Sequence, residues 1–160
     1  MKQVFFTLAI LIACTISAQN SLPDLKLQNL EGQSIPLKSI SSNDQLVIVS
    51  LWATWCVPCK NELDAIAEVY DDWVDETGVK LYAISVDDSR TMRRVKPLVN
   101  GKGWDYEVLL DTNSELKRKL NAPTVPLTLL VKNNKILYRH SGYTPGAEEE
   151  LYEKIKEFSE

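Results

Sequence analysis

Two cysteines three positions apart stand in the segment Leu51-Trp52-Ala53-Thr54-Trp55-Cys56-Val57-Pro58-Cys59-Lys60. The apolar run 45–51 leads into this segment and predicts a strand that is covered on both faces. The run 59–76 leads out of it, with apolar residues at helical spacing. Because side chains at i and i+3 share one side of a helix, the sulfurs of Cys56 and Cys59 are close enough to form a small disulfide ring.

The position of the cysteines at the start of a helix favours reversible thiol–disulfide exchange. Unpaired N–H groups and the positive end of the helix dipole stabilise a thiolate there. Pro58 fits the first turn, where its missing N–H removes no hydrogen bond. We therefore expect Cys56 to be the more exposed nucleophile and Cys59 to be the resolving thiol.

Two other interpretations of a Cys-x-x-Cys motif have less support in the sequence. A zinc site usually needs two further ligands at comparable spacing. Beyond residue 18 the chain has no third cysteine, and its one histidine is His140. A purely structural disulfide would gain little, because cross-link stabilisation is expected to grow with the length of the closed loop. The sequence predicts no metal and no cofactor.

The segment 52–60 resembles the active-site segment of thioredoxin-fold proteins. With Glu62 three residues after the second cysteine, it is similar to the TlpA/ResA-like branch of bacterial extracytoplasmic thiol–disulfide oxidoreductases. The resemblance covers roughly Leu22 to the C-terminus. Two positions depart from it: Ser50 stands where thioredoxin usually carries a buried aspartate, and Asp64 stands where the branch often has proline.

Glu62 is the expected acid–base residue. It lies one helical turn after Cys59 on the same face, and the resolving thiol must lose and regain a proton during exchange. If Glu62 is buried, its pKa should rise towards the useful range. The resemblance implies that it replaces the thioredoxin aspartate at the position of Ser50. The alternative is a solvated carboxylate in the first turn, favoured there by the helix dipole.

Pro126 opens the strand expected at 127–131, a place that suits a residue without an N–H group. By resemblance, the Val125–Pro126 bond is the cis-proline bond of the family. The Val125 backbone would then lie next to Cys56, where an extended substrate segment can add by strand-like hydrogen bonds. The alternative is an ordinary trans proline in a turn. The expected substrate-contacting surface also includes Trp55, Val57 and Pro58.

The remaining pattern predicts an α/β fold. Two short alternating segments, 24–28 and 34–37, predict an N-terminal β-hairpin extension. Further strands are expected at 45–51, 80–86, 106–110, 127–131 and 135–140, and helices at 59–76, 90–100, 114–120 and 147–158. This order indicates a thioredoxin-like sandwich with a mixed central sheet flanked by helices. Pro97 is expected to kink or divide its helix.

The composition is that of one ordinary soluble domain. The chain has 160 residues, of which 44% are hydrophobic and 25% charged, and a net charge of −4. Such a length suits a single hydrophobic core. The short basic clusters 93–94 and 117–119 are interpreted as solvated helix faces, so nucleic-acid binding is not expected.

Residues 1–18 are expected to form a signal peptide ahead of a thioredoxin-like domain at 19–160. A short positive start precedes the apolar run 4–13, which is too short to span a bilayer. The competing interpretation is a lipobox, because Leu11-Ile12-Ala13-Cys14 resembles the bacterial lipoprotein signal. The expected location is the bacterial periplasm after export, or alternatively a lipoprotein anchored to a membrane through a lipidated Cys14.

The resemblance implies a monomeric oxidoreductase that reduces disulfides of target proteins. An upstream membrane thiol donor would re-reduce the Cys56–Cys59 pair, and cytochrome c maturation is the pathway that the resemblance suggests. The alternative within the class is a disulfide oxidant or isomerase. The alternative outside it is a non-catalytic binding module that uses the Val125–Pro126 edge. A thiol peroxidase is disfavoured, since no cysteine lies in a peroxiredoxin-like segment.

Overall fold

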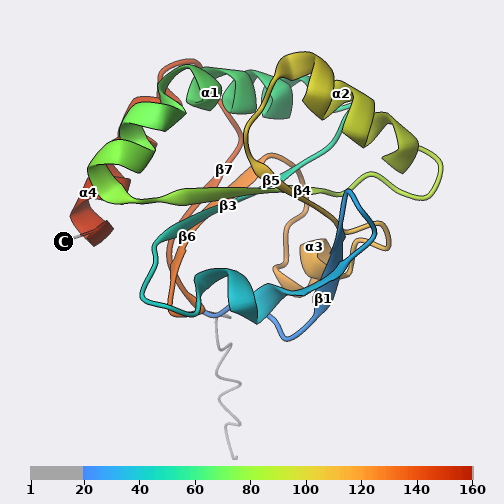
Figure 1. Cartoon of the computed structure of the whole chain (residues 1–160), viewed down its shortest axis with the longest axis horizontal. Coiled ribbons are helices and arrows are strands. Elements are labelled where there is room, and N and C mark those ends of the chain that lie inside the picture. The colour runs from blue at the N-terminus through green and yellow to red at the C-terminus, as the bar shows by residue number, and fades with distance from the viewer. Residues whose placement is uncertain (1–19, 160) are drawn as a thin grey trace, which may run out of the picture.

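The computed structural model describes residues 20–159 (Figure 1). The predicted signal peptide and Cys14 lie outside the described residues. The strands are β1 (Lys26–Asn29), β2 (Ser34–Pro36), β3 (Val47–Trp52), β4 (Lys80–Ser85), β5 (Glu107–Leu110), β6 (Leu127–Lys132) and β7 (Lys135–Ser141). The helices are α1 (Val57–Thr77), α2 (Val95–Lys102), α3 (Glu115–Lys119) and α4 (Ala147–Ser159), with short 3-10 helices η1 (Leu37–Ser41) and η2 (Met92–Arg94).

All seven strands form one mixed sheet in the order β2-β1-β5-β4-β3-β6-β7. The neighbours β3, β4 and β5 run parallel, and the remaining pairs are antiparallel. Helices α1 and α2 cover one face of the sheet, while α3 and η1 lie against the other (Figure 1). The predicted thioredoxin-like α/β sandwich with a mixed sheet and an N-terminal hairpin is confirmed.

The strand β3 and the helix α1 together position the two cysteines. Every residue of β3 is buried, as the continuous apolar run predicted. The chain turns at Cys56, which is the N-cap residue of α1. At the other end, Gly78 adopts the left-handed conformation with φ of 68° and donates its N–H to the Val74 carbonyl. The helix therefore starts directly beyond the end of the most buried strand.

The N-terminal hairpin extends the sheet at its far edge. Leu27 of β1 is buried and pairs with Ile35 of β2, while Gln28 and Asn29 pair with β5. The observed strands begin or end up to two residues from the predicted 24–28 and 34–37. The following 3-10 helix η1 was not predicted.

The helix predicted at 90–100 is wrong in its first half. The chain forms the 3-10 helix η2 and enters the α-helix α2 only at Val95. Pro97 lies in the first turn of α2, where its missing N–H removes no helical hydrogen bond. The proline thus marks where the α-helix begins. No helix among residues 20–159 is long and apolar enough to cross a membrane.

Candidate active site

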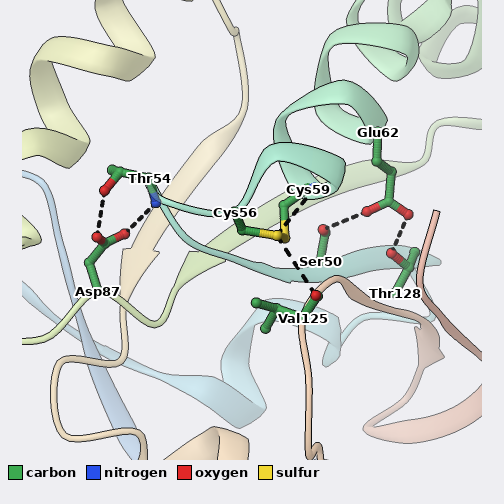
Figure 2. The surroundings of a disulfide bond; sticks show 8 residues. All are labelled: Ser50, Thr54, Cys56, Cys59, Glu62, Asp87, Val125 and Thr128. Atoms are coloured by element: carbon green, nitrogen blue, oxygen red, sulfur yellow. Dashed lines mark hydrogen bonds between the residues drawn. A yellow bond between two sulfur atoms is a disulfide. The ribbon is translucent and has the colours of Figure 1, made fainter.

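A disulfide joins Cys56 and Cys59 at the start of α1, with an S–S distance of 2.03 Å and a Cα–Cα distance of 5.4 Å (Figure 2). The Cys59 N–H donates to the Cys56 sulfur at 3.3 Å, so Cys56 caps its own helix. Cys59 is fully buried and Cys56 is slightly exposed. Cys56 is therefore the more accessible cysteine of the pair.

The Val125–Pro126 peptide bond is cis, as the resemblance implied. The Val125 carbonyl oxygen lies 3.7 Å from the Cys56 sulfur (Figure 2). In the disulfide this sulfur carries no hydrogen, so the contact becomes a hydrogen bond only when Cys56 is a thiol. Among residues 20–159 the Val125 N–H has no hydrogen-bond partner. A half-buried backbone with a free donor therefore lies beside the reactive sulfur.

Glu62 is buried, with 4% of its surface exposed. The Thr128 hydroxyl donates to its carboxylate at 2.7 Å, and the Ser50 hydroxyl donates at 3.5 Å (Figure 2). Burial raises the pKa of Glu62 to about 7, although the two hydrogen bonds lower it and the charge of Glu148 raises it slightly. The alternative of a solvated carboxylate is wrong. Ser50 lies against the Glu62 carboxylate, so the two residues share the region that thioredoxin gives to one aspartate.

The surface around the disulfide is apolar. Trp55 and Val57 are 57% and 59% exposed, and Pro58 is exposed beside them. Pro126, in contrast, is buried, so Val125 is the part of the cis-proline segment that a partner can contact. The tryptophan Trp52 is fully buried and packs edge-to-face against Trp104, with ring centroids 5.2 Å apart.

Asp87 is a buried residue of the site that the sequence analysis did not identify. Its carboxylate accepts hydrogen bonds from the Thr54 N–H at 2.8 Å and the Thr54 hydroxyl at 2.6 Å (Figure 2). It also accepts from the Ser85 hydroxyl at 2.8 Å. In sequence, the run 87–89 has residue types that suit a helix N-cap. Asp88 does cap the following turn, but Asp87 holds the loop that leads to Cys56.

Asp64 and His140 make further contacts around the site. Asp64, in place of the proline of the related branch, accepts hydrogen bonds from Lys102 Nζ at 2.6 Å and Trp104 Nε1 at 3.0 Å. It thereby ties α1 to α2 and to the segment before β5. His140 is half-buried and lines a small cavity together with Glu62.

These features define a class of protein. A cysteine pair at the start of the helix that follows a central strand, facing a cis-proline segment, is the arrangement of thioredoxin-like proteins. A family model described as "AhpC/TSA family" matches residues 18–140. The chain belongs to this thioredoxin-like family.

Curated relatives are named thiol–disulfide oxidoreductases. The chain is 29% identical over 116 residues to thiol-disulfide oxidoreductase ResA of Bacillus thuringiensis (strain Al Hakam), a match that covers 72% of this chain and 64% of the relative. It is 27% identical over 132 residues to sporulation thiol-disulfide oxidoreductase A of Bacillus subtilis (strain 168), covering 82% and 77%. The match therefore spans less than two thirds of the ResA relative.

A similar solved structure is a thioredoxin-like protein from Porphyromonas gingivalis. It is 46% identical to this chain, with a TM-score of 0.77, and the match covers 86% of this chain and 91% of that one. The StoA structure from Bacillus subtilis has a TM-score of 0.66 at 24% identity and covers 88% and 99%. At that identity, StoA supports the fold alone.

Proposed function

We propose that the protein is a thiol–disulfide oxidoreductase that reduces disulfides in target proteins outside the cytoplasm. The observation that carries this proposal is the buried carboxylate of Glu62, one helical turn after a cysteine pair of which Cys56 is the more accessible member. A structural disulfide has no need of a proton acceptor beside it. The names of the curated relatives support the same reaction.

The reaction begins with the reduced pair. The Cys56 thiolate, stabilised by the Cys59 N–H and the start of α1, attacks one sulfur of a target disulfide. The other target sulfur leaves with the bonding electrons and takes a proton from solvent. A mixed disulfide then links Cys56 to the target, whose chain lies extended along Val125.

Resolution of the mixed disulfide uses Cys59 and Glu62. Glu62 takes the proton of the Cys59 thiol, and the resulting thiolate attacks the Cys56 sulfur. The bond between Cys56 and the target breaks, and the target sulfur leaves as a thiolate. The products are a reduced target and the Cys56–Cys59 disulfide of the structure. Because Cys59 is fully buried, it reacts only with Cys56.

Location and partners are part of the proposal. Export through residues 1–18, or anchoring through a lipidated Cys14, would place the protein where target disulfides form. An upstream membrane thiol donor would return the pair to the reduced state. The protein would act as a monomer, with cytochrome c maturation as the candidate pathway. The mass of the N-terminal peptide from producing cells distinguishes cleavage after residue 18 from lipidation at Cys14.

The experiment is capture of targets by the Cys59→Ser variant. Because this variant cannot resolve the mixed disulfide, it should accumulate dithiothreitol-sensitive adducts in producing cells. The matched Cys56→Ser variant keeps one thiol, but that thiol is buried, so it should yield none. Absence of adducts, together with failure of the reduced protein to reduce insulin, would overturn the oxidoreductase proposal.

The redox potential of the Cys56–Cys59 pair tests the direction of the reaction. Potentials in this fold range from about −270 mV for thioredoxin to about −120 mV for a strong oxidant. A reductant should lie near the thioredoxin end when equilibrated against glutathione or dithiothreitol. A potential near the other end would mean that the protein is an oxidant.

A further inference from the structure

A groove lies on one side of the exposed Trp55, directly beside the candidate active site. Its volume is about 410 Å³. Trp55, Val86, Asp88, Arg90 and Thr91 line it, together with Ser114 at the N-cap of α3 and Lys117 within α3. Val86 is the buried apolar residue of this lining, and Trp55 is its exposed apolar residue. A chain segment bound at Cys56 could extend into this groove, because Trp55 directly precedes that cysteine.

The polar side chains that line the groove carry more positive than negative charge. Arg90 and Lys117 supply two cations, and Asp88 supplies one carboxylate. Arg90 Nε and Nη2 both donate to one oxygen of Asp88, at 3.0 and 2.7 Å. Its Nη1 group makes no hydrogen bond to the described residues. Lys117 has no carboxylate within ion-pairing distance among residues 20–159.

The neighbouring sequence adds to this positive charge. Residues 90–94 contain three arginines and no acidic residue, and residues 117–119 are all basic. From sequence alone, the clusters 93–94 and 117–119 are interpreted as solvated helix faces. Arg90 lies three residues before the first of these clusters. The fold brings one residue of each segment, Arg90 and Lys117, to the same groove.

This charge is local, because the chain as a whole is acidic, with a net charge of −4. The acidic residues concentrate elsewhere. The second half of α1 carries the pairs 71–72 and 75–76, and the first turn of α4 carries 148–150. A basic groove at the reactive end of an acidic protein favours partners with negative charge at the point of docking, and steers them there.

We propose that this groove selects target proteins whose cysteines are flanked by acidic residues. The proposal rests on the proposed function and names its substrate class. While Cys56 holds one target sulfur in the mixed disulfide, a residue next to the target cysteine lies against Trp55. Its aliphatic part packs on Trp55 and Val86, and its carboxylate pairs with Lys117 and with the Arg90 Nη1 group.

The test compares two synthetic peptides that differ only in charge. Both contain the same cysteine pair closed by a disulfide. The residues flanking each cysteine are glutamate in one peptide and lysine in the other. The kcat/KM for reduction by the protein, kept reduced with excess dithiothreitol and corrected for the reagent alone, should be about fivefold higher for the acidic peptide. This figure follows from one or two exposed ion pairs of less than about 1 kcal/mol each.

Lys117 variants identify the groove as the source of the preference. Lys117→Gln should reduce the ratio of the two rates, and Lys117→Glu should bring it to one or below. Lys135→Glu is the matched control. Lys135 is exposed at the start of β7, at the end of the β6–β7 pairing that lies away from Pro126. It changes the total charge equally and should leave the ratio unchanged. Any effect of a variant on the Cys56 thiolate cancels in the ratio.

Salt and the possible outcomes complete the test. The ratio of the two rates should fall towards one as ionic strength rises from about 0.05 to about 0.5 M. The screening length is about 10 Å at 0.1 M and shortens as the inverse square root of the ionic strength, so exposed charges attract each other less at high salt. Equal rates for the two peptides, or a preference that Lys117→Glu leaves intact, would overturn the selection of acidic targets. Failure to reduce either peptide would instead overturn the proposed function.

Discussion

Replacing Glu62 by glutamine should change how stability depends on pH. The buried carboxyl has a pKa of about 7 in the folded protein, against an ordinary value of 4.5 in the unfolded chain. Between these values the folded state binds more protons than the unfolded state. The free energy of unfolding of the wild type therefore falls as pH rises from 4.5 to about 7. The stabilising contribution of the protonated carboxyl is complete below this pH range and is lost above it.

The size of the effect follows from the two pKa values. One pKa unit corresponds to about 1.4 kcal/mol, so the wild type should lose about 3 kcal/mol between pH 4.5 and pH 8 from this group. Glutamine keeps the shape and can accept from Thr128 and donate to Ser50, but it does not titrate. The stability difference between Glu62→Gln and wild type should therefore grow by about 3 kcal/mol in favour of the variant.

Urea unfolding of the oxidised proteins across this pH range measures the difference. The oxidised form is used because its two cysteines do not titrate, and other titrating groups cancel between two proteins that differ at one buried site. In the reduced form, the rate of target reduction by the wild type should rise with pH through about 7, while Glu62→Gln should be slower and lack that rise. Parallel stability curves and superimposable rate profiles would refute the role of Glu62.

One labelling experiment and two substitutions have defined outcomes. Iodoacetamide should label Cys56 of the reduced protein faster than Cys59, as mapped by mass spectrometry; faster labelling of Cys59 would reverse their roles. Asp87→Ala should lower the free energy of unfolding by about 1–3 kcal/mol, because the Thr54 N–H loses its buried acceptor; an unchanged urea midpoint would contradict this. Gly78→Ala should cost about 1–2 kcal/mol in the same assay, since φ is 68° there, and wild-type stability would show that the turn rearranges.

Local patterns predicted most of the fold. The mostly apolar run before Cys56 was sufficient to place β3, because it is short and rich in β-branched residues, as a strand covered on both faces is. The helix at 90–100 failed at its start because Pro97 suits a first turn, and the residues before it then form η2 instead.

The parts of the site that escaped prediction depend on contacts between strands. Asp87 looks like a helix cap in sequence, and its bonds to Thr54 arise only because β3 and β4 run side by side. The position of His140 depends on the β6–β7 register, which pairs it with Thr128, and on where α4 packs. Neither pairing has a signal within a single segment. The cysteines were predictable because they belong to a contiguous motif, and Pro126 because it opens a predicted strand and matches the cis-proline of the family resembled.

The start of the described chain determines which way the active site would face on a tethered molecule. The Leu22 N–H donates to the Asn134 carbonyl, and the Asn20 carbonyl accepts from Ile136, so the chain enters beside the β6–β7 turn. The strand β3 runs from this end towards the cysteines, over about 20 Å at the usual rise per residue.

A lipid on Cys14 would therefore attach the molecule at the end of the β6–β7 turn, which lies away from the cysteines. The disulfide would point away from the bilayer, towards proteins that diffuse past it rather than towards membrane-embedded ones. In that orientation a membrane thiol donor would reach Cys56 with a domain that projects beyond the body of this protein.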